Sequence, residues 1–259
     1  MEYFFLFCLV KIYHLMLSKQ KIKFINSLKY NKYRLQYNCF LAEGLHVVND
    51  FIKSDFIVIK IYVTTKLAHH FSTNFELISE KELAKISSFK NPSGVLALIN
   101  KPAASVTTQH HQFSQKRIIL LDSISDPGNM GTIIRTADWF GVKKIYTSKN
   151  CVDVYNPKVV QSSMGSLSRV KIQVTSLISL VNQLKLKNIL SYSTTLNGNS
   201  IYDLSPPDQF ALIFGNESSG VSDSLIKCSD QEIKILNSNH QIDSLNVAVA
   251  FGIILSQFR

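Results

Sequence analysis

The sequence predicts an α/β fold, in which helices cover both faces of a mostly parallel sheet, preceded by a smaller α/β module. From Arg117 onward, short β-rich runs alternate with helical stretches, which is typical of parallel strands joined by crossover helices. The preceding segment 101–116 is polar, contains a proline and has no periodicity, as expected of a linker. A chain of 259 residues has room for two domains. We therefore expect an N-terminal domain at 16–100 and a larger domain at 117–259.

The N-terminal domain is predicted to contain a helical stretch and three short strands. In the lysine-rich stretch 19–37, apolar residues including Leu35 recur at helical spacing, with the lysines on the other face. The β-branched run 57–65 predicts a strand, and "FELIS" and "GVLALIN" predict two more.

The larger domain is predicted to contain six strands and five helical stretches. The strand candidates are "RIILLD", "KKIYTS", "VKIQV", "NILSYST", "FALIFG" and "EIKIL". The helical stretches are 132–140, 157–166, 176–186, 222–227 and 244–258. Ligands of parallel sheets bind at the carboxyl ends of the strands, so the loops that follow the strands are expected to carry the chemistry.

The first 15 residues are set apart from this fold. They are apolar, but they are too few to span a bilayer as a helix, and Lys11 and His14 interrupt them. They lack the basic leader and the small-residue cleavage site of a secretory signal. Met16 begins a more ordinary start for a soluble domain. We interpret residues 1–15 as an over-extended gene start, absent or unstructured in the native protein. A weak membrane tether is the alternative.

The chain is basic, with a formal net charge of +10, and its basic residues cluster near the N-terminus. Such a field attracts RNA, DNA or anionic lipid, although a solvated charged face would look the same. The cluster comprises Lys19, Lys21, Lys23, Lys29, Lys32 and Arg34, with no acid among them. The four cysteines lie far apart and are interpreted as reduced thiols of a cytosolic protein. No metal site is predicted, since the pair His110 and His111 is expected to lie in a solvated loop.

Three polar loops stand out in the larger domain. In "DPGNMGTIIRTADWFG", Pro127 and Gly128 are expected to set a turn before a helix, and Arg135 either forms an ion pair with Asp138 or acts in a site. In "LIFGNESSGVSDSL", an ordinary turn does not account for Glu217. The third loop, "QIDSLN", directly precedes an apolar helix.

The helix after "QIDSLN" is apolar on every side except at Asn246, so Asn246 is expected to be buried with hydrogen-bond partners. Ser244 either caps this helix or belongs to a site. The pattern excludes the usual nucleotide sites, because the sequence has no GxGxxG, no GxxxxGK[ST] and no nucleophile elbow. The absence of the glycine fingerprint disfavours a nicotinamide oxidoreductase.

Taken together, 126–141, 212–221 and 243–250 resemble, in order and spacing, the three motifs of the SpoU/TrmH branch of the SPOUT methyltransferases. These enzymes transfer a methyl group from S-adenosylmethionine (AdoMet) to a ribose 2′-hydroxyl of RNA. Segment 156–170 is similar to the family's intervening region, and 37–48 to its N-terminal substrate-binding domain.

The resemblance implies a SPOUT-type α/β-knot, with a mostly parallel sheet and a C-terminal trefoil knot, and it implies a homodimer. By the same resemblance, cofactor contacts fall on Gly215, Ile235 or Leu236, and Leu245. The catalytic and structural polar cluster would be Asn129, Arg135, Glu217, Ser244 and Asn246. One departure stands before the third motif, where the family's Ile-Pro-Met-like stretch lacks its proline in "IKILNSNHQIDSLNV".

The predicted function is AdoMet-dependent 2′-O-methylation of RNA by a cytoplasmic homodimer that needs no metal and no membrane. Ribosomal RNA is the favoured substrate, and transfer RNA stays open. A non-catalytic RNA-binding assembly factor with the same fold is the rival. A guanidinium stays protonated, so Arg135 is expected to fix a phosphate and to stabilise charge on the ribose oxygen instead of acting as a base. The N-terminal basic cluster is expected to bind RNA.

Overall fold

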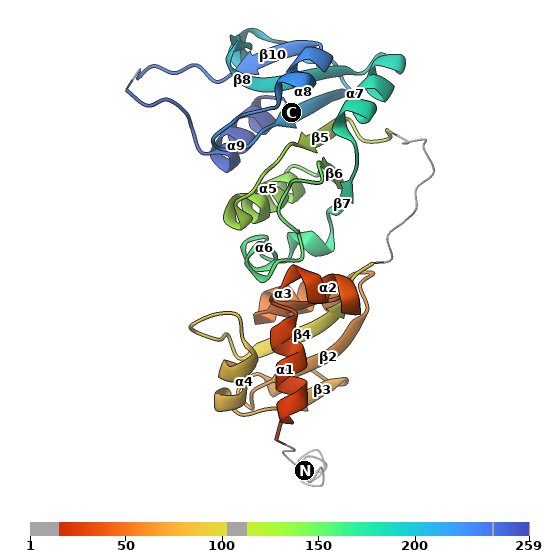
Figure 1. The fold of residues 1–259 in the computed structure, drawn as a ribbon, viewed down its shortest axis with the longest axis vertical. Coiled ribbons are helices and arrows are strands. Elements are labelled where there is room, and N and C mark those ends of the chain that lie inside the picture. The colour runs from red at the N-terminus through yellow and green to blue at the C-terminus, as the bar shows by residue number, and fades with distance from the viewer. Residues whose placement is uncertain (1–15, 103–112, 240, 259) are drawn as a thin grey trace, which may run out of the picture. The chain divides into compact units, whose positions relative to one another are not determined.

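The computed structural model describes residues 16–102, 113–239 and 241–258. The chain divides between Lys101 and Pro102 into two compact units, called unit 1 and unit 2 here. Unit 1 runs from red to yellow in Figure 1, and unit 2 from green to blue. Residues 1–15 and the pair His110–His111 lie outside the described residues. Within the described ranges, no helix has both the length and the apolar character needed to cross a bilayer.

Unit 1 is built on a four-stranded sheet in the order β1-β4-β2-β3. Strand β4 pairs antiparallel with β1 and β2, whereas β3 pairs parallel with β2. The strands are β1 (Cys39–Glu43), β2 (Val58–Val63), β3 (Phe75–Leu77) and β4 (Val95–Asn100). The helices are α1 (Lys19–Ser27), α2 (Asn31–Tyr37), α3 (Leu45–Ile52) and α4 (Glu80–Ile86) with the 3-10 turn η1 (Ala68–His70). The three predicted strands are present, and β1 is an addition.

The lysine-rich stretch 19–37 forms two helices, α1 and α2. At the break, Nη1 of Arg34 donates to the backbone oxygens of Leu28 (2.9 Å) and Lys29 (2.8 Å), carbonyls at the end of α1 that lack intrahelical partners. The expectation that Leu35 faces the core is wrong, because its side chain is 63% exposed. The buried side of α2 is occupied instead by Arg34, which is 2% exposed, and apolar periodicity cannot reveal a buried arginine.

Unit 2 contains a six-stranded sheet in the order β10-β8-β9-β5-β6-β7, and every pairing in it is parallel. The strands are β5 (Arg117–Leu121), β6 (Lys144–Thr147), β7 (Lys171–Val174), β8 (Leu190–Ser200), β9 (Phe210–Phe214) and β10 (Gln231–Lys234). The central strands β5 and β9 are buried along almost their whole length, as expected when helices cover both faces of a sheet. All six predicted strands are confirmed.

Each predicted helical stretch of unit 2 contains a helix, but α5 starts earlier, α6 ends earlier and α9 starts later than expected. The helices are α5 (Pro127–Trp139), α6 (Pro157–Ser162), α7 (Leu177–Leu186), α8 (Asp223–Cys228) and α9 (Val247–Gln257), with 3-10 turns η2 (Ser166–Ser168) and η3 (Ile201–Asp203). Pro127 and Gly128 lie in the first turn of α5 and not in a preceding loop, because Asp126 caps the helix and a proline is well suited to its first position. The last helix, α9, returns to pack against α5 (Figure 1).

Candidate functional site

A hydrogen-bonded cluster joins the three polar loops of unit 2. The amide Nδ2 of Asn129 donates to Oε1 of Glu217 at 2.7 Å. In turn, Nδ2 of Asn246 donates to Oδ1 of Asn129 at 2.9 Å. We call these three residues the polar cluster. Segments that are 88 and 117 residues apart in the chain therefore meet at one place.

Local structure fixes Asn129 at the start of α5. The side chain of Asp126 accepts a hydrogen bond from the backbone N–H of Asn129 at 2.8 Å, which satisfies one of the free donors of the first helical turn. Residue 131 is a glycine that lets α6 approach, since a Cβ there would lie 2.8 Å from the carbonyl oxygen of Val159. The Asp126 cap and the close packing of α6 thus fix the beginning of α5.

Glu217 projects from a tight hairpin that follows β9. Asn216 and Gly220 exchange two backbone hydrogen bonds of 3.0 Å. The side chain of Asn216 donates to the carbonyl oxygen of Ser123 at 2.8 Å, which ties the hairpin to the loop after β5. Gly215 is required here, because a Cβ on it would overlap the backbone of Gly220.

Asn246 has hydrogen-bond partners, as expected, but it is not buried. It is exposed and is the N-cap of α9. Its Oδ1 accepts from the backbone N–H groups of Ala248 (3.0 Å) and Val249 (3.4 Å). The hypothesis that Ser244 caps this helix is therefore wrong, and Ser244 is exposed. One amide side chain both starts α9 and joins α9 to α5.

Arg135 is exposed on α5 and does not form the ion pair with Asp138 that its spacing suggested. Asp138 pairs instead with Arg169, whose Nε lies 2.8 Å from Oδ2. Within the described part of the chain, the guanidinium of Arg135 forms no hydrogen bond and no ion pair. It lies roughly 9 Å along the helix axis from Asn129, at 1.5 Å per residue. The structure thus leaves Arg135 outside the polar cluster of its own chain and free to meet another molecule.

Three of the four residues expected to contact the cofactor lie at the carboxyl ends of two strands, and the fourth, Leu245, precedes α9. Gly215 follows β9, and Ile235 and Leu236 follow β10. Ile235 is half-buried, whereas Leu236 and Leu245 are 53% and 49% exposed. Strand β8 lies between β9 and β10, so these ends lie near one another at one edge of the sheet.

Sequence reasoning missed the hydroxyls where β8 detours from the sheet. The register with β10 is regular up to Ser193 and resumes at Asn199, so the residues between them leave the ladder. Thr194 donates to the carbonyl oxygen of Ile213 at 3.0 Å. The hydroxyls of Ser193 and Thr195 are buried without a partner among the described residues. The run Ser-Thr-Thr at the end of a strand is the feature of the sequence that could have identified these hydroxyls.

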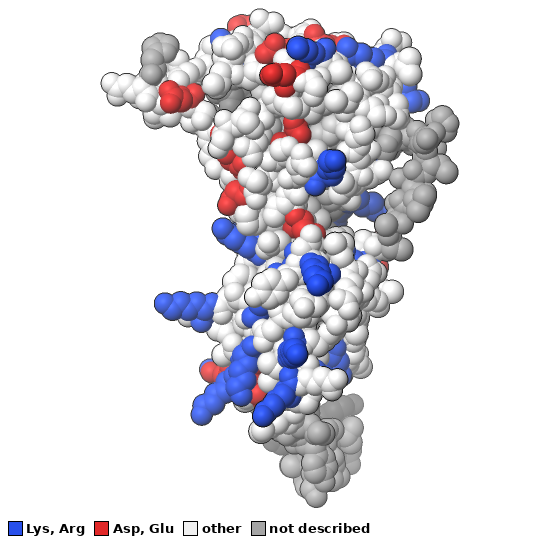
Figure 2. All heavy atoms as spheres, in the orientation of Figure 1, with Lys and Arg blue, Asp and Glu red and all other residues white. Residues whose placement is uncertain are grey.

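The basic residues of unit 1 separate into two groups. Lys19, Lys23 and Lys32 are exposed, and Figure 2 shows Lys and Arg side chains gathered on the face of unit 1 that carries α1. Lys21 forms a 2.8 Å ion pair with Glu76 and keeps 41% of its side chain exposed.

Two members of the predicted RNA-binding set have structural roles instead. Lys29 donates to the carbonyl oxygen of Ser87 at 2.6 Å, and its burial lowers the pKa of its ammonium group. Arg34 is buried against the end of α1, and a buried guanidinium cannot contact a phosphate. The assignment of Arg34 to RNA binding is therefore corrected. In the described ranges, no group of three or more His, Cys, Asp or Glu side chains could hold a metal ion.

Family models and relatives agree with this arrangement. The model of the SpoU rRNA Methylase family matches residues 116–256, and that of the MRM3-like substrate binding domain matches residues 19–97. The chain belongs to the SpoU rRNA methylase family. The 23S rRNA (guanosine(2553)-2′-O)-methyltransferase RlmP of Bacillus subtilis is 32% identical to this SpoU chain over 247 residues, covering 93% of the chain and 97% of the relative. An uncharacterized tRNA/rRNA methyltransferase of Synechocystis is 32% identical over 190 residues, covering 73% and 68%.

Solved structures of SpoU and TrmH proteins share the fold. A TrmH-family protein from Porphyromonas gingivalis superimposes with a TM-score of 0.84 at 31% identity, covering 95% of this chain and 99% of the other. The SpoU methyltransferase AviRb from Streptomyces viridochromogenes, solved with AdoMet, gives 0.80 at 22% identity, covering 93% and 97%. The predicted fold class is confirmed, both for the parallel-sheet SPOUT domain and for the small N-terminal substrate-binding domain.

Proposed function

We propose that this SpoU protein is an AdoMet-dependent RNA methyltransferase that methylates a ribose 2′-hydroxyl of ribosomal RNA. The observation that carries the proposal is the polar cluster, in which all three family motifs are joined by two hydrogen bonds of 2.7 and 2.9 Å. The relative RlmP, which matches almost the whole chain, is named as a 23S rRNA 2′-O-methyltransferase. Ribosomal RNA is therefore preferred to transfer RNA as the substrate.

The residues at the carboxyl edge of the sheet fit AdoMet. Partner-free buried hydroxyls at Ser193 and Thr195 need an acceptor or donor, and the adenosine part of AdoMet offers both. Gly215 keeps a strand end open to close approach of a ligand. Ile235, Leu236 and Leu245 supply partly or largely exposed apolar surface. When bound, AdoMet supplies an activated methyl group on a positively charged sulfur.

The chain's own residues then have to place a ribose hydroxyl and manage its charge. Asn129 cannot rotate freely, because its amide donates to Glu217 and accepts from Asn246. The cluster thus offers preorganised dipoles that need no rearrangement during the reaction. Ser244, exposed near the start of α9, completes the group that positions the nucleotide. Arg135 fixes the adjacent phosphate and stabilises the negative charge that develops on the ribose oxygen.

A homodimer explains why Arg135 lies apart from the polar cluster. Leu245, just before α9, and Val249, on α9, lie on either side of Asn246 in the sequence and are 49% and 51% exposed, so the start of α9 presents apolar surface beside the site. A second subunit covering this surface would bring its own Arg135 to the cluster. Two inactive variants test this, Arg135→Ala and Asn129→Ala. Mixed dimers recover activity if the arginine serves the partner's cluster, and stay inactive if it serves its own.

The function itself is tested by cofactor binding and by mapping. We expect calorimetry to detect AdoMet binding by the purified protein, and ribose methylation of ribosomal RNA to be lost at one position in cells lacking the gene. No AdoMet binding at millimolar concentration would favour a non-catalytic assembly factor. Loss of a transfer RNA methylation instead would move the substrate to that class. Since ribosomal RNA is the expected substrate, we further propose that the protein acts in the cytoplasm.

A further inference from the structure

We infer that α1 and α2 of unit 1 carry a stacking surface for unpaired RNA bases, so that the RNA bound by this domain is a loop or a single strand. The inference rests on the proposed function and adds to it the kind of RNA that the domain takes. The surface consists of Tyr30, Tyr33 and Tyr37, with Phe24 beside them, and we call it the aromatic face.

Two tyrosines of the aromatic face lie on one side of α2, and the third precedes the helix. Tyr33 and Tyr37 are four residues apart, so their side chains leave α2 on the same side, whereas Tyr30 is the N-cap residue of α2 and has an extended backbone. The rings of Tyr33 and Tyr37 are nearly parallel, with 12° between their planes and 6.3 Å between centroids. Phe24, on α1, meets Tyr37 edge-on at 5.1 Å. The rings of Phe24, Tyr33 and Tyr37 thus support one another before any ligand binds.

Two of these rings are open to solvent although they are large and aromatic. Tyr30 is 67% exposed and Tyr37 is 42% exposed, whereas Tyr33 is half-buried and Phe24 packs partly against the core of unit 1. Burial in the core therefore does not account for Tyr30 and Tyr37. Tyrosine on a surface presents an apolar ring face at a small cost in side-chain entropy, which suits recognition of a flat partner.

Positive charge surrounds the aromatic face. Lys32 places its ammonium group 5.8 Å from the ring centroid of Tyr33, and Lys19 and Lys23 are exposed on the neighbouring helix. No acidic residue occurs from Met16 to Ala42. Figure 2 shows the same excess of Lys and Arg on this side of unit 1. A protein partner would need an unusually acidic surface to match it, whereas RNA supplies regularly spaced phosphates.

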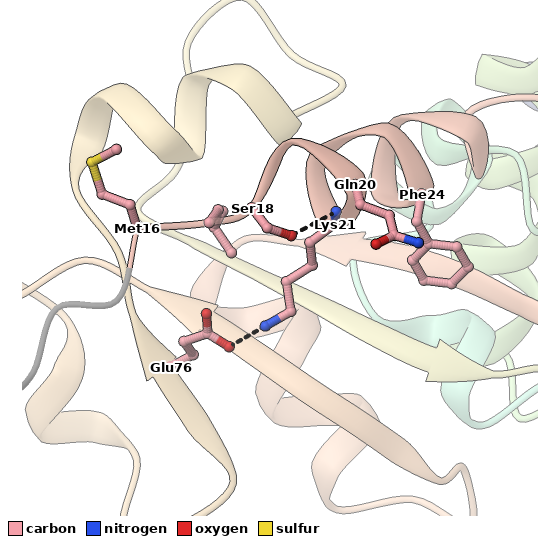
Figure 3. Close-up of a pocket in the computed structure, with 7 residues that line it drawn as sticks. Met16, Ser18, Gln20, Lys21, Phe24 and Glu76 are labelled. Carbon is pink, nitrogen blue, oxygen red and sulfur yellow. Dashed lines mark hydrogen bonds and ion pairs between the residues drawn. The ribbon is translucent and has the colours of Figure 1, made fainter.

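A hollow next to Phe24 extends the surface along α1. Its volume is about 420 Å³, and its lining includes Gln20, Lys21 and Glu76. Figure 3 shows Gln20 and Phe24 projecting from the same side of α1, one turn apart, with the Lys21–Glu76 ion pair across the hollow. An aromatic ring beside an amide matches the combination of stacking and hydrogen bonding by which unpaired bases are read.

Single-stranded RNA fits this surface better than a duplex does. In a duplex, base faces are already stacked and only the backbone and the base edges are exposed, so tyrosine rings would find no face to stack on. In a loop or a single strand, each base offers a free face, and lysines between the rings contact the phosphates.

The test uses the full-length protein and a short single-stranded RNA with 2-aminopurine at its centre, whose fluorescence falls on stacking. Tyr30→Ala and Tyr37→Ala should each weaken binding roughly tenfold and reduce the quenching, and Tyr30→Phe should restore both. Leu35→Ala is the matched control, because Leu35 is 63% exposed on another side of α2. Lys23→Ala should weaken binding of single strand and duplex alike, whereas the tyrosine changes should spare the duplex.

The outcomes separate this inference from the proposed function. Unchanged single-strand affinity and quenching in both tyrosine variants, in protein that binds AdoMet and methylates ribosomal RNA, would overturn the stacking surface alone. Equal losses for single strand and duplex would also overturn it, since that result indicates phosphate contacts or misfolding. Absence of AdoMet binding by the unaltered protein would count against the proposed function, whatever the tyrosine variants do.

Discussion

In unit 2 the amide and carboxylate side chains of the polar cluster bond to one another, whereas Lys23, Lys32 and Tyr30 of unit 1 are exposed to solvent. Asn129 uses both ends of its amide within the cluster. Tyr30 and Lys23 point outward on a short helical pair. A methyl transfer needs atoms held within a fraction of an ångström, which only a shared hydrogen-bond network provides. Gripping an RNA backbone needs charge and flat surface, and tolerates mobile side chains.

The comparison also explains how each region is built. The polar cluster depends on three distant chain segments, so any change that moves one of them should affect chemistry. The basic and aromatic face depends on residues within one short stretch, so single changes there should lower affinity in small, independent steps. Variants in which turnover, cofactor binding and stability are measured separately therefore test whether the two regions differ in this way.

The largest effect is expected for Arg135→Ala. Removing the guanidinium should reduce turnover about 10²–10³-fold, the scale for losing a group that stabilises developing charge. AdoMet affinity should stay nearly unchanged, because Arg135 contacts no described residue of the cofactor edge. Single-turnover methylation and calorimetry measure the two quantities.

Lys171→Ala is the control for this change. It removes an exposed positive charge from β7, at the far edge of the sheet from β10, and should leave turnover as it is. Full activity of Arg135→Ala would remove Arg135 from the mechanism. An equal loss in the Lys171 variant would show that overall charge, and not the guanidinium at this place, matters.

The second-largest effect is expected for Gly215→Ala. The added Cβ would overlap the backbone of Gly220, so the hairpin bearing Glu217 must shift, at a cost of about 1–3 kcal/mol for overpacking. AdoMet affinity should fall along with the free energy of unfolding. Thermal unfolding with and without AdoMet measures both.

Gly252→Ala is a matched control on α9. Its Cβ would lie 3.8 Å from Cγ2 of Thr136, an ordinary contact, and alanine favours a helix by about 1 kcal/mol over glycine. This variant should be as stable as the original or slightly more so, with unchanged AdoMet binding. If Gly215→Ala behaved like Gly252→Ala, the close approach at Gly215 would not limit the site.

A smaller effect, confined to chemistry, is expected for Asn246→Ser. Serine still caps α9, but it loses the Nδ2 donor that reaches Asn129. Stability should therefore change by less than about 1 kcal/mol, while turnover falls roughly tenfold or more because Asn129 is no longer held. Asn246→Ala would lose cap and donor together and serves as the comparison. A serine variant with normal turnover would mean that the link between α9 and α5 is structural only.

Much of unit 2 was predictable because local signals and the final structure agree. The runs "RIILLD" and "FALIFG" are apolar and β-branched because both faces of β5 and β9 are covered, so composition alone identified them. The convergence of three loops was predictable only through the family resemblance, since no local rule joins Asn129 to residues 88 and 117 positions away.

What could not be predicted depended on long-range partners. Asp138 has an ideally spaced neighbour in Arg135, yet it pairs with Arg169, which is brought close by the turn after α6. Arg34 resembled its neighbouring lysines in sequence, but its side chain is buried and its Nη1 donates to two carbonyls at the end of α1. Asn246 looked buried because the helix after it is apolar all round, although part of that apolar surface is exposed in the single chain.

The smallest effect is expected in unit 1, for Glu43→Gln. Glu43 is buried at the end of β1 and accepts from the hydroxyl of Ser87 and from the backbone N–H of Ser88 at 2.7 Å. Its burial raises the pKa of the carboxyl above 4.5, against the opposing effect of these hydrogen bonds. A raised folded-state pKa stabilises unit 1 below pH 4.5, and this stabilisation is lost as the pH rises through the folded value.

Glu43→Gln should therefore make the stability of unit 1 less dependent on pH as the pH rises above 4.5 and through the raised folded-state pKa, because glutamine does not titrate. Hydrogen exchange of the β4 amides reports this locally. Glu80→Gln is the control of opposite sign, since the ion pair of Glu80 with Lys66 at 2.8 Å lowers the carboxyl pKa. Its contribution is fully present above the unfolded pKa and is lost as the pH falls through the folded pKa. RNA binding should be untouched in both variants, since neither carboxylate lies on α1 or α2. A pH profile identical to that of the unaltered protein would show that Glu43 titrates as it does in the unfolded chain.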